Sequence, residues 1–176
     1  DHQIGAGGRA AEFTWWIKAV DGSLNFTRNL PHFAVVVACL NGARTEHAIV
    51  IDPMRNEEFV ASRGQGCRMS GRQLLRVSNQ SKLDGALIAI PSAGSGRLNT
   101  LLREAGASTR SSGCVSLDLA WVAAGRLDGA VITEANAAAV AAGNLLTAES
   151  GGLAGDFRGG PVDPGAGASS VRSILA

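Results

Sequence analysis

The stretch WWIKAVDGSLNF (residues 15–26) decides how this sequence is interpreted. Its apolar beginning leads into Asp21-Gly22-Ser23, a short acidic turn of the kind that can hold a metal ion and a phosphate group. Asp21 could instead be an ordinary turn residue that caps a helix, because Asp favours both positions. Lys18 stands three residues before Asp21, where a metal site would need a second carboxylate rather than a cation. The stretch therefore raises a choice between a phosphatase site, a disabled site and a simple turn.

A β-hairpin is predicted directly after this stretch. HFAVVVACL (32–40) is a β-branched apolar run of strand length, and Asn41-Gly42 separates it from ARTEHAIVID (43–52). Asn-Gly between two such runs predicts a type I′ turn, whose two central residues both need positive φ. The segments 57–64 and 64–78 predict further strands, so we expect an antiparallel meander over residues 31–78. His32 and His47 are expected to be strand residues with hydrogen-bonded ring nitrogens.

Strands and helices alternate in the second half of the sequence. We expect strands at 86–90 and 129–133 and helices at 96–106, 111–125 and 136–152. Ser111 or Ser112 is the expected N-cap of the middle helix and Gly125 its end, while Asn136 is the expected N-cap of the last helix. Strands followed by alternating β and α elements indicate the α+β class. Residues 1–85 would form an N-terminal lobe with the antiparallel sheet and the phosphate or metal motif, and residues 86–176 a C-terminal α/β lobe.

Composition restricts the classes of partner. Hydrophobic residues make up 45% of the chain and charged residues 18%, which is typical of a folded protein. A net charge of +1 gives no electrostatic reason to expect nucleic acid as a partner. No apolar run is long enough to span a membrane and no signal-peptide pattern opens the sequence, so we expect a cytoplasmic protein without a membrane partner. Three cysteines without CxxC spacing are expected to be reduced thiols: Cys39, Cys67 and Cys114.

The motifs together resemble a known family. The stretch 15–26 resembles the signature W-x-x-D-P-x-D-G-T-x-N-F, and blocks at 31–35, 63–78, 111–129 and 141–152 follow in the same order. This pattern, over residues 13–156, is similar to the inositol monophosphatase family of magnesium-dependent, lithium-sensitive sugar-phosphate phosphatases. The resemblance implies a layered αβαβα sandwich, here without a counterpart of the family's N-terminal helices. It also implies Mg²⁺ as cofactor, a small phosphorylated metabolite as substrate and a homodimer.

The resemblance assigns roles to individual positions. Asp21 corresponds to a metal ligand and Val20 supplies a ligand carbonyl, while Gly22 and Ser23 form the phosphate cradle. Asp21 and Ser23 would therefore take part in catalysis. Further substrate contacts would come from three residues of a later loop and from an acid near the family's sugar-binding Glu: Gly113, Cys114, Val115 and Glu134. For Cys114, packing at a helix start is the other interpretation.

Two family ligand positions have changed in this sequence. Lys18 occupies the place of the first Asp of the signature, and Ala139 the place of a later metal-binding Asp. Mg²⁺ prefers carboxylate and water oxygens, which neither side chain supplies. Lys18 could pair with Asp21 and fill the metal position, which predicts weak or absent metal binding. The resemblance favours a Mg²⁺-dependent phosphomonoesterase of small phosphate monoesters with impaired activity, and the alternative is a non-catalytic relative that binds phosphate or serves in oligomerisation.

Overall fold

The computed structural model describes residues 12–71, 73–133, 135–156 and 160, together with the backbone of 2–3 and 174–175. Its first sheet has seven strands in chain order, each antiparallel to the next: β1 (His2–Gln3), β2 (Phe13–Asp21), β3 (Ala34–Asn41), β4 (Arg44–Asp52), β5 (Glu57–Ser62), β6 (Cys67–Met69) and β7 (Gln73–Leu74). The second sheet has the order β11 (Ile174–Leu175), β10 (Gly129–Ile132), β8 (Leu87–Ala89), β9 (Ser108–Arg110). The helices are α1 (Ser23–Thr27), α2 (Gly96–Glu104), α3 (Val115–Ala123) and α4 (Ala137–Glu149).

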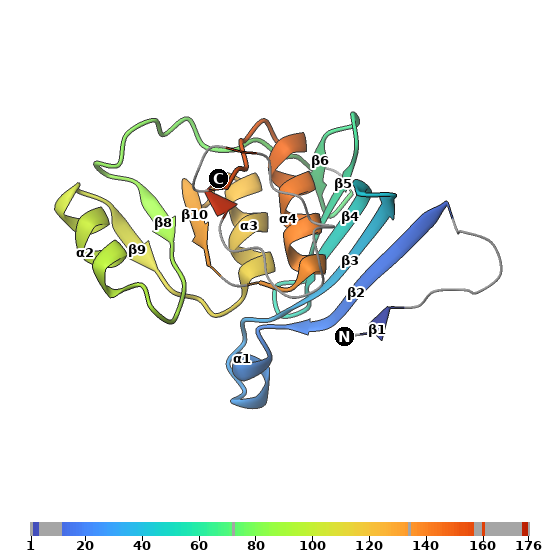
Figure 1. The fold of residues 1–176 in the computed structure, drawn as a ribbon, viewed down its shortest axis with the longest axis horizontal. Helices are drawn as coiled ribbons and strands as arrows, with labels where there is room; N and C mark the ends of the chain where they lie inside the picture. Colours follow the sequence, from blue (N-terminus) through green and yellow to red (C-terminus); the bar gives the residue numbers. More distant parts are fainter. Residues whose placement is uncertain are drawn as a thin grey trace.

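These elements form layers. The helices α3 and α4 lie between the two sheets, and α2 covers the outer face of the second sheet (Figure 1). Apolar residues of β3, β4 and β5 pack on α3 and α4, and β8 and β10 pack on the other side of the same helices. The α+β class predicted from the sequence is confirmed. The described residues supply four layers, α–β–α–β, of the five that the resemblance implies, and the division into lobes at residue 85 stays a prediction.

The predicted hairpin is present, but its turn type was wrong. Asn41 pairs with Arg44, so the two turn residues are Gly42 and Ala43 rather than Asn41 and Gly42. Gly42 has a φ of 59°, whereas Ala43 is not among the residues with positive φ. A type I′ turn needs positive φ at both positions, and glycine at the first of two turn residues is typical of type II′. Asn41 is thus the last residue of the strand.

The helix ends agree with the sequence prediction in part. The Asn136 side chain accepts a hydrogen bond from the Ala138 N–H at 2.8 Å, which confirms it as the N-cap of α4. Gly125, with a φ of 67°, follows α3 and confirms the predicted end of that helix. The predicted N-cap of α3 was wrong, because α3 begins after Cys114 without a side-chain cap. The hydroxyl of Ser112 instead accepts from the Cys114 N–H at 3.0 Å, inside the loop before the helix.

The cysteines and the helix lengths are also defined by the structure. All three cysteines are free and buried, as expected for reduced thiols. Across the described part of the chain, every helix is too short or too polar to cross a membrane.

Candidate functional site

The site is centred on Asp21, the last residue of β2, and a β-bulge determines its orientation. Lys18 pairs with Val36 and Asp21 with Ala34, so two residues of β2 stand opposite one residue of β3. In a regular strand, residues three apart point to opposite faces. The bulge removes this alternation, and the side chains of Lys18 and Asp21 share the face of the sheet that packs on the central helices.

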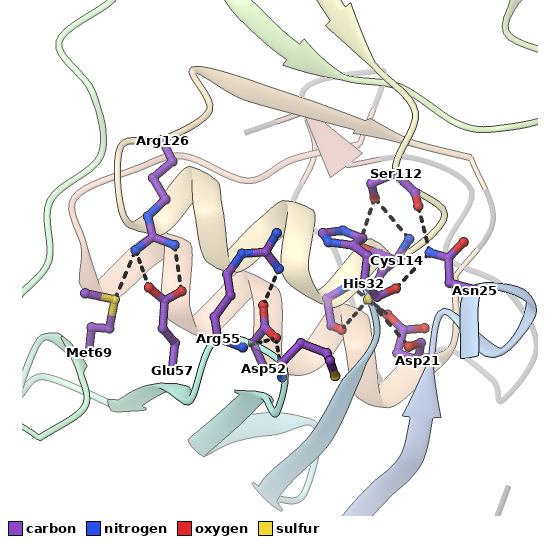
Figure 2. Close-up of polar contacts among 12 residues, drawn as sticks. Asp21, Asn25, His32, Asp52, Arg55, Glu57, Met69, Ser112, Cys114 and Arg126 are labelled. Carbon is purple, nitrogen blue, oxygen red and sulfur yellow. Dashed lines mark hydrogen bonds and ion pairs between the residues drawn. The ribbon is translucent and has the colours of Figure 1, made fainter. Parts of the chain in front are cut away.

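The Asp21 carboxylate is buried and bound to the start of α3. Its Oδ2 accepts a hydrogen bond from the Ser116 N–H at 2.8 Å and lies 3.6 Å from the Cys114 thiol (Figure 2). The Asp21 carbonyl also accepts from the Cys114 Sγ at 3.5 Å. An amide at a helix start is a favourable partner for a carboxylate. Asp21 therefore joins β2 to α3 and does not cap α1, whose N-cap residue is Gly22.

Glycine is required next to Asp21 for two reasons. Gly22 has a φ of 78°, and a Cβ at this position would lie 3.1 Å from both the Cys114 Cβ and the His32 carbonyl oxygen. Either condition disfavours other residues. Gly113, with a φ of 77°, lies against the side chain of Asn25 in α1. At Gly113 the positive φ favours glycine, whereas at Gly22 the positive φ and the close contacts both do.

The Asn25 side chain joins the loops around residues 32 and 112. Its Nδ2 donates to the His32 carbonyl at 2.8 Å and to the Ser112 carbonyl at 2.9 Å. Ser23 is exposed at the first position of α1, and the first hydrogen bond of that turn runs from Phe26 N to the Gly22 carbonyl. The preceding amides, including that of Ser23, have no acceptor within the helix. An anion at this turn would meet these amides and the Ser23 hydroxyl.

Lys18 lies beside the retained carboxylate. Its Nζ is 3.9 Å from Asp21 Oδ1, and its side chain is 25% exposed. One carboxylate oxygen of Asp21 thus faces an ammonium group and the other accepts an amide hydrogen bond. Among the residues that the structure describes, no group of three or more His, Cys, Asp or Glu side chains is placed to hold a metal ion. The donors around Asp21 therefore do not fit the Mg²⁺ ions that the resemblance implies.

A second carboxylate, Asp118, lies in α3 close to this site. Burial raises its pKa to about 7; a hydrogen bond with Ser112 lowers that pKa and the nearby Asp21 charge raises it. Burial, followed by the Asp21 charge, also raises the pKa of the Cys114 thiol to about 12. Cys114 is therefore protonated near neutral pH, and its S–H serves as a donor to Asp21.

The two histidines differ from each other. His47 is in β4, and its Nδ1 is 2.9 Å from the Ser62 hydroxyl, as predicted. His32 precedes β3, and its Nε2 is buried without a hydrogen-bond partner in the described part of the chain, so the prediction for His32 was wrong. Burial, together with the Arg55 charge, lowers the pKa of His32. Its ring contacts Trp121 edge-on, with centroids 5.1 Å apart.

Comparison with known proteins adds to this geometry. A model of the inositol monophosphatase family matches residues 2–174. The chain belongs to this family. Two curated relatives are Nus factor SuhB of Pseudomonas aeruginosa, 43% identical over 171 residues, and Nus factor SuhB of Escherichia coli, 42% identical over 161 residues. These alignments cover 89% and 87% of this chain but 61% and 60% of the relatives, so the chain spans about three fifths of their length.

Solved structures of the inositol monophosphatase family show the same fold. The IMPase of Thermotoga maritima has a TM-score of 0.86 and 27% identity, and the match covers 96% of this chain and 65% of that chain. The inositol monophosphatase of Anabaena has a TM-score of 0.83 and 29% identity, with 96% and 68% of the two chains covered. The suspected family resemblance is confirmed.

Within this family frame, the structure brings some of the expected site residues together. Asp21, Gly22 and Cys114 are in contact, and Gly113 lies opposite Asn25. Val115 is the first residue of α3 and, with Gly113 and Cys114, lines a cavity of about 40 Å³. Ala139 is fully buried in the first turn of α4. Val20 lies in the bulge of β2, and Glu134 is outside the described residues. The roles assigned to all these residues stay predictions.

Three residues of the site were not anticipated. Asn25 is part of the quoted motif, but the sequence assigned it no role. The Ser116 amide and the Asp118 carboxylate are inside an apolar helical pattern, where Asp118 would ordinarily be placed on the solvated side. Only its burial distinguishes Asp118 as a residue of the site. That burial results from the packing of α3 and cannot be recognised from the neighbouring residues in the sequence.

Proposed function

We propose that this chain binds the phosphate group of a small phosphorylated metabolite at the turn of Gly22 and Ser23, with the Lys18 ammonium offsetting the negative charge of Asp21. The observation that carries the proposal is the 3.9 Å approach of Lys18 Nζ to Asp21 Oδ1 on one face of the sheet. This placement neutralises the buried carboxylate, which would otherwise repel a phosphate. The free amides at the start of α1 supply hydrogen bonds to an anion.

We favour hydrolysis less, because of the residues that this chain carries at the expected metal-ligand positions. In the family resemblance, the metal ions are held by several carboxylates, and here the described region retains Asp21 with Lys18 and Ala139 at two ligand positions. An ammonium within 4 Å of a divalent ion is repulsive, and an alanine offers no oxygen. The residues that orient a phosphate are mostly backbone groups of Gly22 and Ser23, so binding can persist when the carboxylates are replaced.

Mg²⁺-dependent phosphomonoesterase activity is the second candidate. Two observations favour it: the family membership, and the burial of Asp21 in a defined hydrogen-bonded position. The names of the relatives include both an enzyme, the Thermotoga IMPase, and a factor, Nus factor SuhB. The family membership alone therefore does not decide between the two candidates.

Calorimetric titration with inositol 1-phosphate, with and without Mg²⁺, tests the binding proposal. We expect binding without added metal, and we expect Lys18→Met to weaken it about tenfold because the charge of Asp21 is then no longer offset and repels the phosphate. Lys82→Met is the matched control, since Lys82 is an exposed lysine outside the site. Binding that requires Mg²⁺, or that is equally strong in Lys18→Met, would contradict the proposal.

Phosphate release from the same compound tests the second candidate. We expect no Mg²⁺-dependent release by the unmodified chain. The double substitution Lys18→Asp with Ala139→Asp restores two carboxylates and is expected to increase Mg²⁺ binding, whereas each single substitution should change little because ligands of one site act together. Mg²⁺-dependent turnover by the unmodified chain would establish the hydrolase and overturn our preference.

A further inference from the structure

A cavity lies beside the turn between β3 and β4. Its volume is about 550 Å³, which is within the range of roughly 300–1,000 Å³ of small-molecule sites. Four segments that are distant in the sequence form its wall: residues 43–45 around the start of β4, Arg63 after β5, residues 144, 145 and 148 in the second half of α4, and residues 152–154. The phosphate turn at Gly22 and Ser23 and the expected metal positions leave this cavity without a role.

The cavity and the phosphate turn lie at opposite ends of the antiparallel sheet. Asp21 pairs with Ala34, the first residue of β3, whereas the cavity begins after Asn41, the last residue of that strand. Figure 1 shows the turn between β3 and β4 at the end of β2 that is farther from α1. Seven residue steps, roughly 23 Å at about 3.3 Å each, separate the two ends of β3. A small ligand in the cavity therefore does not touch Gly22 or Ser23.

Two arginines line the cavity and share one carboxylate. Arg44 Nε lies 3.0 Å from Glu46 Oε1, and Arg63 Nε lies 3.8 Å from the same oxygen. Two cations beside one anion leave a net positive charge at this wall. Toward the described residues, the Nη groups of Arg44 and Nη1 of Arg63 donate no hydrogen bond. These donors are therefore available to an anion, whose geometry a guanidinium fork matches.

Backbone contacts hold this cationic wall in place. Arg63 donates from Nε and Nη2 to the Thr45 carbonyl, so its guanidinium is fixed against the start of β4. The other carboxylate nearby is that of Glu149 at the end of α4, which accepts from the amides of Gly64 and Gly66 at 2.8 Å each and is not part of the wall. The wall thus presents two guanidinium groups, one of them already ordered, and an ordered group loses less entropy when it binds a ligand.

The rest of the wall combines an amide with apolar side chains. Asn144 Oδ1 is buried and has no hydrogen-bond partner in the described part of the chain. A buried acceptor without a partner is unfavourable, so a ligand that donates a hydrogen bond to it would be favoured once the amide turns toward the cavity. Leu153, which is 85% exposed, supplies apolar surface together with Ala148 and Ala154. A ligand with an apolar body would remove this surface from water, whereas a free inorganic anion would not.

We propose that this cavity binds a small organic anion, a carboxylate or phosphomonoester that carries an apolar body and a hydroxyl group. Its anionic group pairs with the guanidinium groups of Arg44 and Arg63. Its hydroxyl group donates to Asn144, and its apolar body covers Leu153. The site is separate from the phosphate turn and does not depend on the function proposed for that turn.

Calorimetric titration of the intact chain with 3-hydroxybenzoate tests the anionic contact. We expect Arg44→Gln to weaken binding about tenfold, as expected for the loss of a charge-assisted hydrogen bond. The Arg44 side chain is 66% exposed, so its replacement should not disturb folding. Arg103→Gln, a substitution of an exposed arginine in α2, is the matched control and should leave the affinity unchanged. The neutral isostere 3-hydroxybenzamide should bind more weakly than 3-hydroxybenzoate and should not respond to Arg44→Gln. 3-Hydroxyphenyl phosphate should behave as 3-hydroxybenzoate does, also in Lys18→Met.

Benzoate, which lacks the hydroxyl group, tests the contact with Asn144. It should bind to the unmodified chain more weakly than 3-hydroxybenzoate does. The two compounds should bind equally to Asn144→Leu, because that side chain has a similar shape and no acceptor. Equal affinity of the two compounds for the unmodified chain would contradict the proposed role of the hydroxyl group.

NMR spectroscopy of the isotope-labelled chain locates the bound ligand. We expect 3-hydroxybenzoate to shift the backbone amide resonances of Arg44, Thr45 and Leu153, with the same dissociation constant as in calorimetry, and to leave those of Gly22 and Ser23 unchanged. Shifts confined to Gly22 and Ser23 would place the ligand at the phosphate turn and overturn the proposal. Absence of binding, equal affinity in Arg44→Gln, or equal affinity for the neutral isostere would overturn it as well.

Discussion

Replacing Asp118 by asparagine is predicted to stabilise the protein at alkaline pH and to have little effect at acid pH. Asp118 is 5% exposed, and burial raises its pKa from 3.8 to about 7. The folded protein therefore favours the protonated carboxyl group, which the neutral amide of asparagine resembles in shape and charge. The substitution removes the ionisation while leaving the packing of α3 largely unchanged.

The sign of the effect follows from proton linkage. The raised pKa contributes stability that is fully present below about pH 3.8, the value for the unfolded chain, and is lost as pH rises through the folded-state value of about 7. The difference between the two pKa values corresponds to roughly 4 kcal/mol in the free energy of unfolding. Between pH 4 and pH 8.5, the free energy of unfolding of the wild type should fall by about this amount relative to Asp118→Asn.

Urea unfolding at pH 4 and pH 8.5 measures this difference directly. At pH 8.5 the variant should have the higher midpoint, and its Tm should exceed that of the wild type by several degrees, at about 2–4 °C per kcal/mol for a chain of this size. Asp84→Asn replaces an exposed carboxylate and should show no comparable dependence on pH. If the stability difference between wild type and Asp118→Asn is the same at both pH values, the carboxyl group does not titrate in this interval and the reasoning is refuted.

Three further substitutions test how the site is supported. Gly143→Ala should lower the free energy of unfolding by about 1–3 kcal/mol, because the added Cβ would lie 2.7 Å from the Leu119 Cβ. Gly96→Ala is the control, since a Cβ there meets open space and should be nearly neutral. Equal midpoints of the two variants in urea unfolding would contradict this. Asn136→Ala removes the cap of α4 and should cost about 1 kcal/mol, so an unchanged midpoint would show that the cap is dispensable. Asn25→Ala removes both hydrogen bonds between the site loops and should cost about 2 kcal/mol; amide exchange should rise in both loops, and exchange that stays slow would refute this role.

The sequence predicted the elements whose signals are local. Asn136 is an N-cap because its side chain reaches an amide two residues away, and Gly125 ends α3 because it adopts positive φ. The order of the five motif blocks predicted the family, which the family match confirms. Each of these signals depends on a few adjacent residues, so it can be recognised without knowledge of the packing.

Other features depend on contacts between distant segments. The hydrogen bond from Asn25 to the Ser112 carbonyl spans 87 residues, and the one from the Ser116 amide to Asp21 spans 95. Strand β2 was missed because its run of aromatic and small residues lacks regular alternation, and the bulge before Asp21 disrupts the alternation further. The turn type failed for a related reason: Asn41 pairs with Arg44 and so belongs to the strand, and the bulge between Cys39 and Leu40 shortens the loop to Gly42 and Ala43.

The bulge in β2 supports the proposal that phosphate binding persists although the expected metal ligands have changed. Its backbone places residues 18 and 21 on one face of the sheet, whichever side chains they carry. With two carboxylates at these positions, the face would attract cations; with Lys18 and Asp21, it carries an ion pair instead. The amides after Gly22 keep their orientation in both cases, because they depend on the positive φ of the glycine and on its contact with Cys114. The backbone thus preserves the turn that we propose to bind an anion, while positions 18 and 139 are those at which the family resemblance expects metal-binding carboxylates.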